Sequence, residues 1–307
     1  MAMIASLTWA REDETFARPV GHATLAVPQR PRAVVTLTDA AGRAAHGEAA
    51  PLPGYSSDTL DAVCATLDAL ATAPAGPVVL HIDPAWPPSL RFALEWALFQ
   101  LDPQALPALA ARPRRVVDVN AMLGPALDPS IDARAARKVA AGFTTLKLKV
   151  GAPGRWHDEH RALCRLAQRH PAVTWRLDAN GAWSPELARR ALAMLHGLRV
   201  DVVEEPLSGE ALLALDAGPW AADESLSLPG FAARLAGAPR GCKALVLKPT
   251  LHGVSGCLAL DAYARAAGLG VIVTHCFEGP VGRRGVRALA ERLGAPGWAQ
   301  GIDEDRD

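Results

Sequence analysis

Three acidic residues of this chain each follow a short run of apolar residues. They are Asp178 in LDAN, Glu204 in VEEP and Asp223 in ADES. Taken singly, an acid at the end of a strand is more often a cap for the following helix. Three acids that meet at one place repel one another unless a cation lies between them. An all-oxygen ligand set suits Mg²⁺, so the three together predict a divalent-metal site.

The second and third acids each have an acidic neighbour, which leaves two of the ligands open. The alternatives are Glu204 or Glu205, and Asp223 or Glu224. Periodicity alone does not choose between the members of either pair. Asn180 follows Asp178 by two residues, so both side chains are expected on one face, where Asn180 would support the metal. A helix cap explains Asn180 equally well, and both interpretations stay open.

Lysines lie before and after these acids along the chain. Lys147 and Lys149 alternate with apolar residues in TLKLKV, so both are expected to point to one side of a strand. In a barrel whose outside is covered by helices, that side is the interior. Lys248 ends the run LVLKPT, on a strand expected roughly across the barrel. A lysine that is crowded by cations and partly desolvated has a lowered pKa and can act as a base.

The acids and lysines together predict the chemistry of a carbon acid. Removal of a proton beside a carboxylate creates an enediolate, and a metal ion placed where the negative charge develops stabilises it. Neither a lone lysine nor a lone metal is expected to supply the roughly 8–23 kcal/mol by which enzymes commonly lower a barrier. We therefore expect an enzyme that acts on a small-molecule carboxylate.

Seven short strand-like runs alternate with helical patterns in the second part of the chain. They are VVDVN (116–120), TLKLKV (145–150), VTWRLD (173–178), VDVVEE (200–205), PWAADE (219–224), ALVLKP (244–249) and GVIVTH (270–275). This alternation is typical of βα units around a parallel sheet. Polar residues at successive strand ends favour a barrel with its site at the C-terminal mouth. A doubly wound sheet gathers its ligands at one switch point, and the chain contains no G-x-G-x-x-G loop.

We therefore predict an α/β protein with a (β/α)7β-type, TIM-like barrel and an N-terminal α+β capping domain. The capping domain is expected over 1–112, the barrel over 113–294 and a short tail over 295–307. Within the first domain, 33–48 predicts a hairpin with a turn at 39–42, and 56–71 and 89–101 predict helices, the first with Ser/Asp caps. An eighth barrel strand is missing, degenerate or supplied by another region.

The overall composition excludes several classes of partner. Lys plus Arg and Asp plus Glu both number 32, so no net field attracts nucleic acid or an anionic membrane. Five cysteines form no C-x-x-C pair, which argues against a disulfide framework and a structural zinc site. The first residues turn acidic before any sustained apolar run, unlike a signal peptide. We expect a cytoplasmic protein that neither spans nor binds a membrane.

The motifs KLKV, LDAN, VEEP, ADES and VLKPT, in this order and spacing, closely resemble those of the enolase superfamily, in particular its muconate-lactonizing branch. In that superfamily a lysine base works together with Mg²⁺. The resemblance covers nearly the whole chain. It implies that the metal ligands are Asp178, Glu204 and Asp223. It also implies that Lys149 is the base of the Lys-x-Lys pair, which Lys147 completes, and that Lys248 faces this base across the substrate.

A narrower resemblance lies in HGEAAPLPGYSSDTL (46–60), which is similar to the segment that o-succinylbenzoate synthases place over the barrel mouth. It places Gly54 and Tyr55 among the expected substrate contacts, although a strand, a proline-rich turn and a capped helix also explain the segment. These synthases dehydrate 2-succinyl-6-hydroxycyclohexadiene carboxylate in menaquinone synthesis. By analogy, Lys149 takes the α-proton, Mg²⁺ or Mn²⁺ holds the enediolate, and Lys248 stabilises charge over the ring.

The end of the seventh strand supplies the remaining expected substrate contacts. In the same families this region positions substrate-contacting backbone, which implies contacts from His275, Glu278 and Gly279. The amides of Gly279 and Gly282 are expected to donate to the succinyl carboxylate. A packed histidine is the alternative for His275, because two lysines already fill the acid and base roles.

Three alternative functions remain open. An N-acylamino acid racemase or dipeptide epimerase would use the same metal, with Lys149 and Lys248 on opposite faces of the α-carbon. A barrel that has lost catalysis would serve as a binding protein. A metal-free barrel that forms a Schiff base on a lysine would leave the three acids without a role.

Overall fold

The structure is a computed structural model. It describes residues 2–22, 25–72, 76–235 and 241–303, and the side chains of 14–28 are not described. The chain divides into two compact units, each built from three segments. Unit 1 comprises Met1–Val116, Leu247–Asp261 and Val273–Leu293, and unit 2 comprises Val117–Val246, Ala262–Ile272 and Gly294–Asp307.

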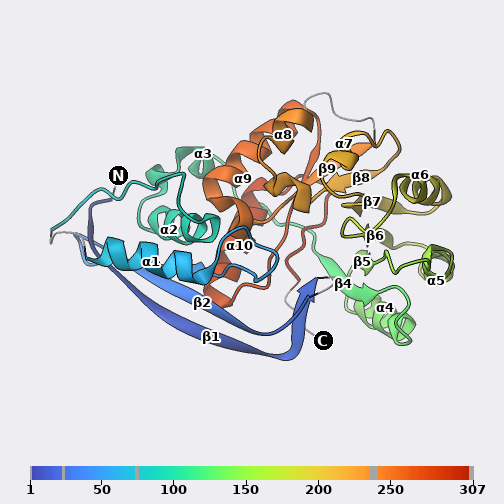
Figure 1. Ribbon diagram of the computed structural model, residues 1–307, viewed down its shortest axis with the longest axis horizontal. Helices are drawn as coiled ribbons and strands as arrows, with labels where there is room; N and C mark the ends of the chain where they lie inside the picture. Colours follow the sequence, from blue (N-terminus) through green and yellow to red (C-terminus); the bar gives the residue numbers. More distant parts are fainter. Residues whose placement is uncertain (1, 23–24, 73–75, 236–240, 304–307) are drawn as a thin grey trace. The chain divides into compact units, whose positions relative to one another are not determined.

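Unit 1 contains an antiparallel sheet with the strand order β1-β2-β3 (Figure 1). Its strands are β1 (Ile4–His22), β2 (Leu25–Asp39) and β3 (Ala44–Ala49). Its helices are α1 (Leu60–Ala71), α2 (Pro88–Leu101), α3 (Pro107–Ala110) and α10 (Pro280–Leu293), with the 3₁₀ turn η1 (Pro103–Ala105). The α+β architecture predicted for this part is confirmed, and β1 is a long strand that the sequence analysis did not identify.

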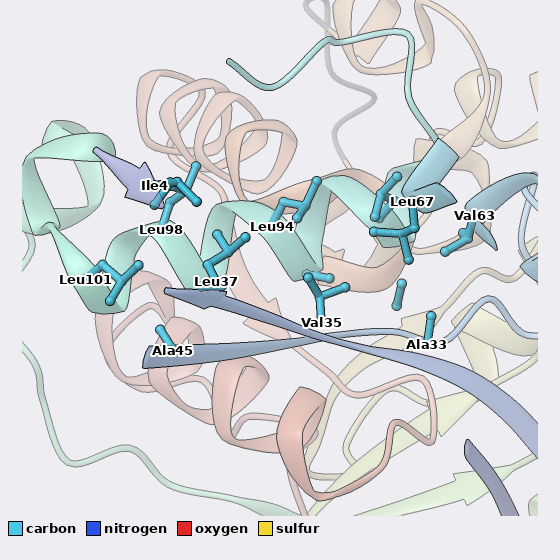
Figure 2. Packing of buried hydrophobic residues seen from close by; sticks show 14 residues of the cluster. Ile4, Ala33, Val35, Leu37, Ala45, Val63, Leu67, Leu94, Leu98 and Leu101 are labelled. Carbon is cyan, nitrogen blue, oxygen red and sulfur yellow. The ribbon is translucent and has the colours of Figure 1, made fainter. Parts of the chain in front are cut away.

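The hairpin of β2 and β3 has one apolar face and one polar face. Ala33, Val35 and Leu37 alternate along β2 and are fully buried in a core with residues of α1 and α2 (Figure 2). The predicted turn is closed by Asp39, whose carboxylate accepts the backbone N–H groups of Ala41 and Arg43, each at 2.9 Å. The opposite face carries Thr36 and Thr38, which are partly exposed, and His46, which is exposed.

Helix α1 begins later than predicted. Thr59 is its N-cap and accepts the N–H of Ala62 at 3.3 Å, so the expected Ser/Asp cap is wrong. Asp58 instead accepts the N–H and the hydroxyl of Ser89, at 3.0 and 2.6 Å, in the first turn of α2. The Asp58 carboxylate therefore accepts hydrogen bonds from the first turn of α2, 31 residues further along the chain.

Seven strands form a second sheet in the order β10-β9-β8-β7-β6-β5-β4, and the neighbouring strands from β4 to β9 are parallel. The strands are β4 (Asn120–Pro125), β5 (Thr145–Lys149), β6 (Thr174–Asp178), β7 (Val200–Glu204), β8 (Trp220–Ala222), β9 (Cys242–Leu247) and β10 (Gly270–Val273). The helical segments between them are α4 (Ile131–Ala140), α5 (Trp156–Arg169), α6 (Pro185–Met194), α7 (Glu210–Leu213), η2 (Glu224–Ser227), α8 (Phe231–Arg234) and α9 (Pro249–Ala266). The predicted barrel class is confirmed.

The first barrel strand was predicted too early in the chain. Residues 116–118 form no strand, and Val116 is fully exposed. Pairing with β5 runs from Asn120 opposite Thr145 to Pro125 opposite Lys149. The valines of VVDVN suggested a strand, but position beside β5 decides which residues are buried and paired.

The C-terminal segment takes part in the barrel next to β4. Gln300 forms a parallel bridge with Val119, and its amide and carbonyl bond to Asp118 and Asn120 at 2.7 and 3.0 Å. The Gln300 side chain also donates to the carbonyl of Val271 in β10, at 3.3 Å. A short piece of the predicted tail therefore lies between the two outer strands of the sheet, where an eighth strand would lie.

A cluster of apolar residues lies in unit 2 just before the ends of the strands. Val202, Ala221, Ala244, Val246 and Ile272 form a buried cluster, with Trp298 packed against it. Val202 precedes Glu204 by two residues, as Ala221 precedes Asp223, so each pair shares a face of its strand. The cluster thereby supports the polar residues at the strand ends. Among the described residues, no helix is long and apolar enough to cross a membrane.

Gly47 tests the close approach of β3 and α2. A Cβ atom at Gly47 would lie 1.9 Å from the carbonyl oxygen of Ala93, so Gly47→Ala must push β3 away from α2. We expect it to lower the free energy of unfolding by about 1–3 kcal/mol or more, measured by urea denaturation. Gly42→Ala is the control, because Gly42 has a φ of 79° and nothing within 4 Å, and strain alone costs about 1–2 kcal/mol. Equal losses in the two variants would contradict this account.

Candidate active site

The three predicted acids lie on neighbouring strands of unit 2. Asp178 ends β6 and is paired in register with Glu204 at the end of β7, and Asp223 directly follows β8. Their residues are only 4%, 1% and 2% exposed. Three carboxylates withdrawn from water at one end of a sheet require nearby positive charge.

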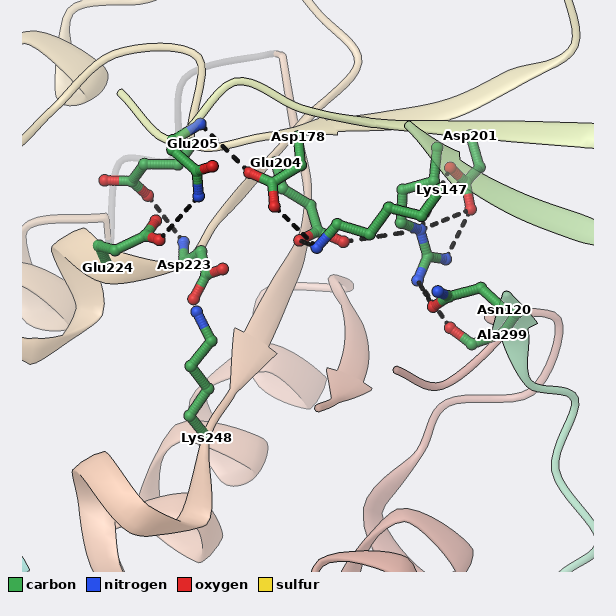
Figure 3. A network of polar contacts seen from close by, with 12 residues as sticks. Asn120, Lys147, Asp178, Asp201, Glu204, Glu205, Asp223, Glu224, Lys248 and Ala299 are labelled. Carbon is green, nitrogen blue, oxygen red and sulfur yellow. Dashed lines mark hydrogen bonds and ion pairs between the residues drawn. The ribbon is translucent and has the colours of Figure 1, made fainter. Parts of the chain in front are cut away.

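Lys147 supplies part of that positive charge. Its ammonium nitrogen lies 3.0 Å from a carboxylate oxygen of Asp178 and also donates to Glu204 (Figure 3). Burial lowers the pKa of Lys147, but the carboxylates of Asp178, Glu204 and Asp223 outweigh it and raise the pKa above its ordinary value. Lys147 is therefore a permanent cation near neutral pH and is poorly suited to act as a base.

Lys149 differs from Lys147 in its exposure. It lies two residues further along β5, so it shares a face with Lys147 and is partly exposed, whereas Lys147 is buried. In the sheet it is paired with Pro125 on one side and Asp178 on the other. Of the two lysines of the Lys-x-Lys pair, Lys149 is thus the more exposed.

The members of each acidic pair differ in their contacts, and the first pair is Glu204 and Glu205. Glu205 accepts the N–H groups of Asp223 and Ser225, at 2.8 and 3.0 Å, and burial together with the charge of Glu224 raises its pKa to about 7. Glu204, by contrast, contacts Lys147. The geometry thus favours Glu204 over Glu205 as the residue that faces the other acids.

The members of the second pair, Asp223 and Glu224, also differ in the groups that they contact. Asp223 is the member whose charge acts on Lys147, whereas Glu224 acts on Glu205 and accepts a hydrogen bond from the Asn180 side chain at 3.2 Å. Asn180 therefore holds Glu224, and its own amide donates to Asp178 at 3.1 Å.

Two residues beside the acids have unusual backbones. Asn180 and Glu205 have φ angles of 45° and 41°, values that L side chains rarely adopt. Such backbone strain persists only where the surrounding structure imposes it, and it occurs most often at functional sites. The strained residues lie directly beside the candidate ligands, which agrees with a site at this end of the sheet.

Arg176 is a member of the site that the sequence analysis missed. It is completely buried, donates to Asn120 and to the carbonyl of Ala299 at 3.1 and 2.7 Å, and pairs with Asp201 at 2.6 Å. Its guanidinium also lies 3.8 Å from Glu204. The signal was present, because Arg176 precedes Asp178 by two residues and therefore shares its face.

In unit 1, Lys248 lies against Tyr55. The Lys248 ammonium donates to the tyrosine hydroxyl and lies 4.8 Å from the centre of its ring. The contact joins the two motifs VLKPT and PLPGY. Gly54, which precedes Tyr55, has a φ of 72° that favours glycine and permits this turn. Nearby, burial and the charges of Lys248 and Arg91 lower the pKa of His252 to about 4.

The segment after β10 bonds both to itself and to other parts of unit 1. His275 accepts the N–H of Phe277 at 3.2 Å through Nδ1. Glu278 is fully buried and accepts the hydroxyl of Thr250 and, at 2.7 Å, the N–H of Cys276. The amides of Gly279 and Gly282, which were expected to meet a substrate carboxylate, donate instead to Glu48, because that buried carboxylate lies directly opposite them.

The donor set of unit 2 fits a hard divalent cation. Asp178, Glu204 and Asp223 offer only oxygen ligands, the kind that Mg²⁺ prefers, and Lys147 alone does not balance three negative charges. Within residues 2–22, 25–72, 76–235 and 241–303, no three His, Cys, Asp or Glu side chains form a ready-made metal group. Lys147 instead lies between two of the acids.

Comparison with known proteins agrees with this fold. Residues 130–298, more than half of the chain, match the family described as Enolase C-terminal domain-like. The chain is 32% identical to o-succinylbenzoate synthase of Vibrio cholerae, over 90% of this chain and 82% of that protein. It is 29% identical to the synthase of Thermosynechococcus vestitus, over 97% and 92%. The chain therefore belongs to the enolase superfamily, whose members are generally metal-dependent enzymes.

Solved structures show the same fold. A Mg-bound o-succinylbenzoate synthase from Thermosynechococcus elongatus has a TM-score of 0.76 at 27% identity, and the match covers 96% of this chain and 92% of that structure. The L-Ala-D/L-Glu epimerase from Bacillus subtilis has a TM-score of 0.82 at 24% identity and covers 95% of this chain. The second similarity is evidence of fold only.

Lys147 allows a test of the charge balance. Lys147→Met leaves Asp178 and Glu204 buried without their cation, and breaking such a pair costs about 3–5 kcal/mol. We expect the free energy of unfolding in EDTA, measured with urea, to fall by that amount. Lys138→Met is the control, because Lys138 is also buried and its ammonium lies 3.4 Å from Asp303. A loss no greater than that of the control would contradict the proposed charge balance.

Proposed function

We propose that this protein is a divalent-metal-dependent dehydratase of the o-succinylbenzoate synthase type. The observation that carries the proposal is the different environment of two lysines on one face of β5. Lys147 is buried between two carboxylates, whereas Lys149 is partly exposed. One lysine is thus a fixed cation and the other is available as a base. Similarity to synthases at about 30% identity over most of the chain supports the substrate class.

In the proposed reaction, Asp178, Glu204 and Asp223 would hold Mg²⁺ or Mn²⁺. The cation, when bound, would supply positive charge where the substrate carboxylate becomes more negative. Lys149 removes the proton from the carbon beside that carboxylate. The ring carbon–oxygen bond then breaks, the proton on Lys149 joins the departing hydroxide as water, and the ring becomes aromatic.

Lys248 favours a reaction with a single base. Its nitrogen contacts the Tyr55 hydroxyl and lies 4.8 Å from the centre of the tyrosine ring. A lysine held in this way is suited to stabilising negative charge rather than to removing a proton. An N-acylamino acid racemase or dipeptide epimerase needs a base on each face of the α-carbon, so this contact favours the dehydratase.

The test of the activity is the ultraviolet absorbance change when the protein and Mg²⁺ meet 2-succinyl-6-hydroxycyclohexadiene carboxylate. We expect rapid aromatisation that an EDTA-treated sample lacks. We expect Lys149→Ala to abolish turnover while the fold and the Mg²⁺ affinity stay nearly unchanged, because the base alone is removed. Lys243→Ala, at an exposed lysine of β9, is the control. A Lys149→Ala variant that keeps most of its activity would exclude Lys149 as the base.

Absence of dehydration by protein that binds Mg²⁺ would reject the proposed substrate. Candidate dipeptides and N-acylamino acids would then be incubated with the protein in deuterated water. An epimerase is expected to place deuterium at the α-carbon of both stereoisomers.

Asp223→Asn tests the assignment of the metal ligands. We expect its Mg²⁺ affinity, measured by calorimetric titration, to fall by about 10- to 100-fold or more, since loss of a supporting outer-shell partner already costs that much. Glu224→Gln is the matched control and should retain most of the affinity, because Glu224 contacts Asn180. The reverse pattern would make Glu224 the ligand.

A further inference from the structure

Glu48 is a buried carboxylate that no step of the proposed reaction uses. It lies on β3 and is only 1% exposed. It accepts the N–H of Gly279 at 2.5 Å and the N–H of Gly282 at 2.9 Å. Both amides belong to the start of α10, where helix N–H groups have no partner within the helix. A strand of the N-terminal part therefore caps a helix near the end of the chain.

The cap fits closely around its two glycines. A Cβ atom at Gly282 would lie 2.7 Å from the Cβ of Glu278 and 3.2 Å from the carboxylate carbon of Glu48. A Cβ atom at Gly279 would lie 2.2 Å from the guanidinium of Arg32 and 2.9 Å from Glu48. The segment can therefore reach the carboxylate only because both positions lack a side chain, and it has little room to shift.

Glu278 extends these contacts toward Lys248. It directly precedes Gly279, and its two carboxylate oxygens accept the hydroxyl of Thr250 and the N–H of Cys276. Thr250 is fully buried and follows Lys248 by two residues. A continuous set of hydrogen bonds and neighbouring residues therefore runs from Glu48 through Gly279, Glu278 and Thr250 to the backbone that carries Lys248.

We propose that Glu48 is a positioning residue, which holds residues 275–282 in place and, through Glu278 and Thr250, fixes the orientation of Lys248 toward Tyr55. The proposal rests on the proposed function for the role of Lys248, but the position of Lys248 can be measured without it. Replacement of the Glu48 carboxylate by an amide leaves one acceptor oxygen for two backbone amides and loosens the segment that anchors Thr250. Lys248 then loses its defined position, while Lys149, the proposed base, is unchanged.

Glu95 offers a matched control in the same unit. It is 4% exposed and likewise accepts two backbone amides, those of Val254 and Ser255 at 2.5 and 3.1 Å. These amides lie beyond Gly253, whose φ of 71° and ψ of 172° interrupt α9. Glu95→Gln should therefore remove a comparable cap and lower stability without moving Lys248, which lies on the other side of the interruption.

The experiment measures acetylation of Lys248 by acetic anhydride in the full-length protein, with mass spectrometry and the exposed Lys243 as internal reference. We expect a severalfold faster Lys248 reaction in Glu48→Gln than in the wild type or Glu95→Gln, because its contact with Tyr55 is weakened. Thr250→Val removes the hydrogen bond to Glu278 but leaves the contacts of Glu48 intact, and it should raise the acetylation rate of Lys248 to the same extent. When Glu48→Gln and Thr250→Val are combined, the two increases in rate should not add, because both substitutions act through the same set of contacts.

Kinetics on the proposed substrate give a second readout. We expect Glu48→Gln to lower kcat by about 10- to 100-fold with a smaller change in KM, because Lys248 is misplaced relative to the reacting atoms. Glu95→Gln should keep kcat near that of the wild type. Glu48→Asp, which keeps the charge, should recover part of the lost kcat.

Two results would overturn the proposal. If Lys248 is acetylated at the same rate in Glu48→Gln and Glu95→Gln, Glu48 contributes to stability but does not position Lys248. If Thr250→Val leaves the acetylation rate of Lys248 unchanged, Thr250 does not connect Glu48 to Lys248. If the wild type does not dehydrate the cyclohexadiene carboxylate, the proposed function fails, while the acetylation rates still decide the role of Glu48.

Discussion

The ion pairs of Lys147 are the interaction on which the site depends. Asp178, Glu204 and Asp223 are nearly inaccessible to water, and burial of that much negative charge is costly without a cation. Lys147 contacts two of these acids and is itself held in the charged state by all three. Lys149, two residues further along β5, is partly exposed and so differs in environment from Lys147.

Buried glutamates hold several of the loops that follow barrel strands. Glu159 accepts the amides of Gly151 and Ala152 after β5, and Glu205 accepts that of Asp223 after β8. Glu48 and Glu95 do the same for α10 and for the second part of α9. Each carboxylate satisfies amides that would otherwise be buried without a partner, so it limits the conformations of a loop that carries functional residues. Functional groups on loops gain precision from such supports.

Much of the fold and the site was predictable from local patterns. Runs such as TLKLK and TWRLD have the composition and alternation of strands. Six of the seven predicted barrel strands coincide closely with observed ones, and the first shares only Asn120 with β4. The strand at 116–120 was misplaced because valines raise strand propensity wherever they occur, whereas only residues from Asn120 onward pair with β5. The cap of α1 was also misassigned, because Asp58 bonds to Ser89, a partner 31 residues away.

The amino-acid sequence by itself determined which strands end in acids and lysines and which face each of them shares, because side chains alternate along a strand. Only the tertiary structure distinguishes the contacts of Glu204 from those of Glu205, and the contacts of Asp223 from those of Glu224, since adjacent residues differ in the partners that other strands bring to them. The same holds for the pairing of Glu48 with Gly279 and Gly282. Contacts between residues more than 200 positions apart depend on how the elements pack, and no local pattern encodes them.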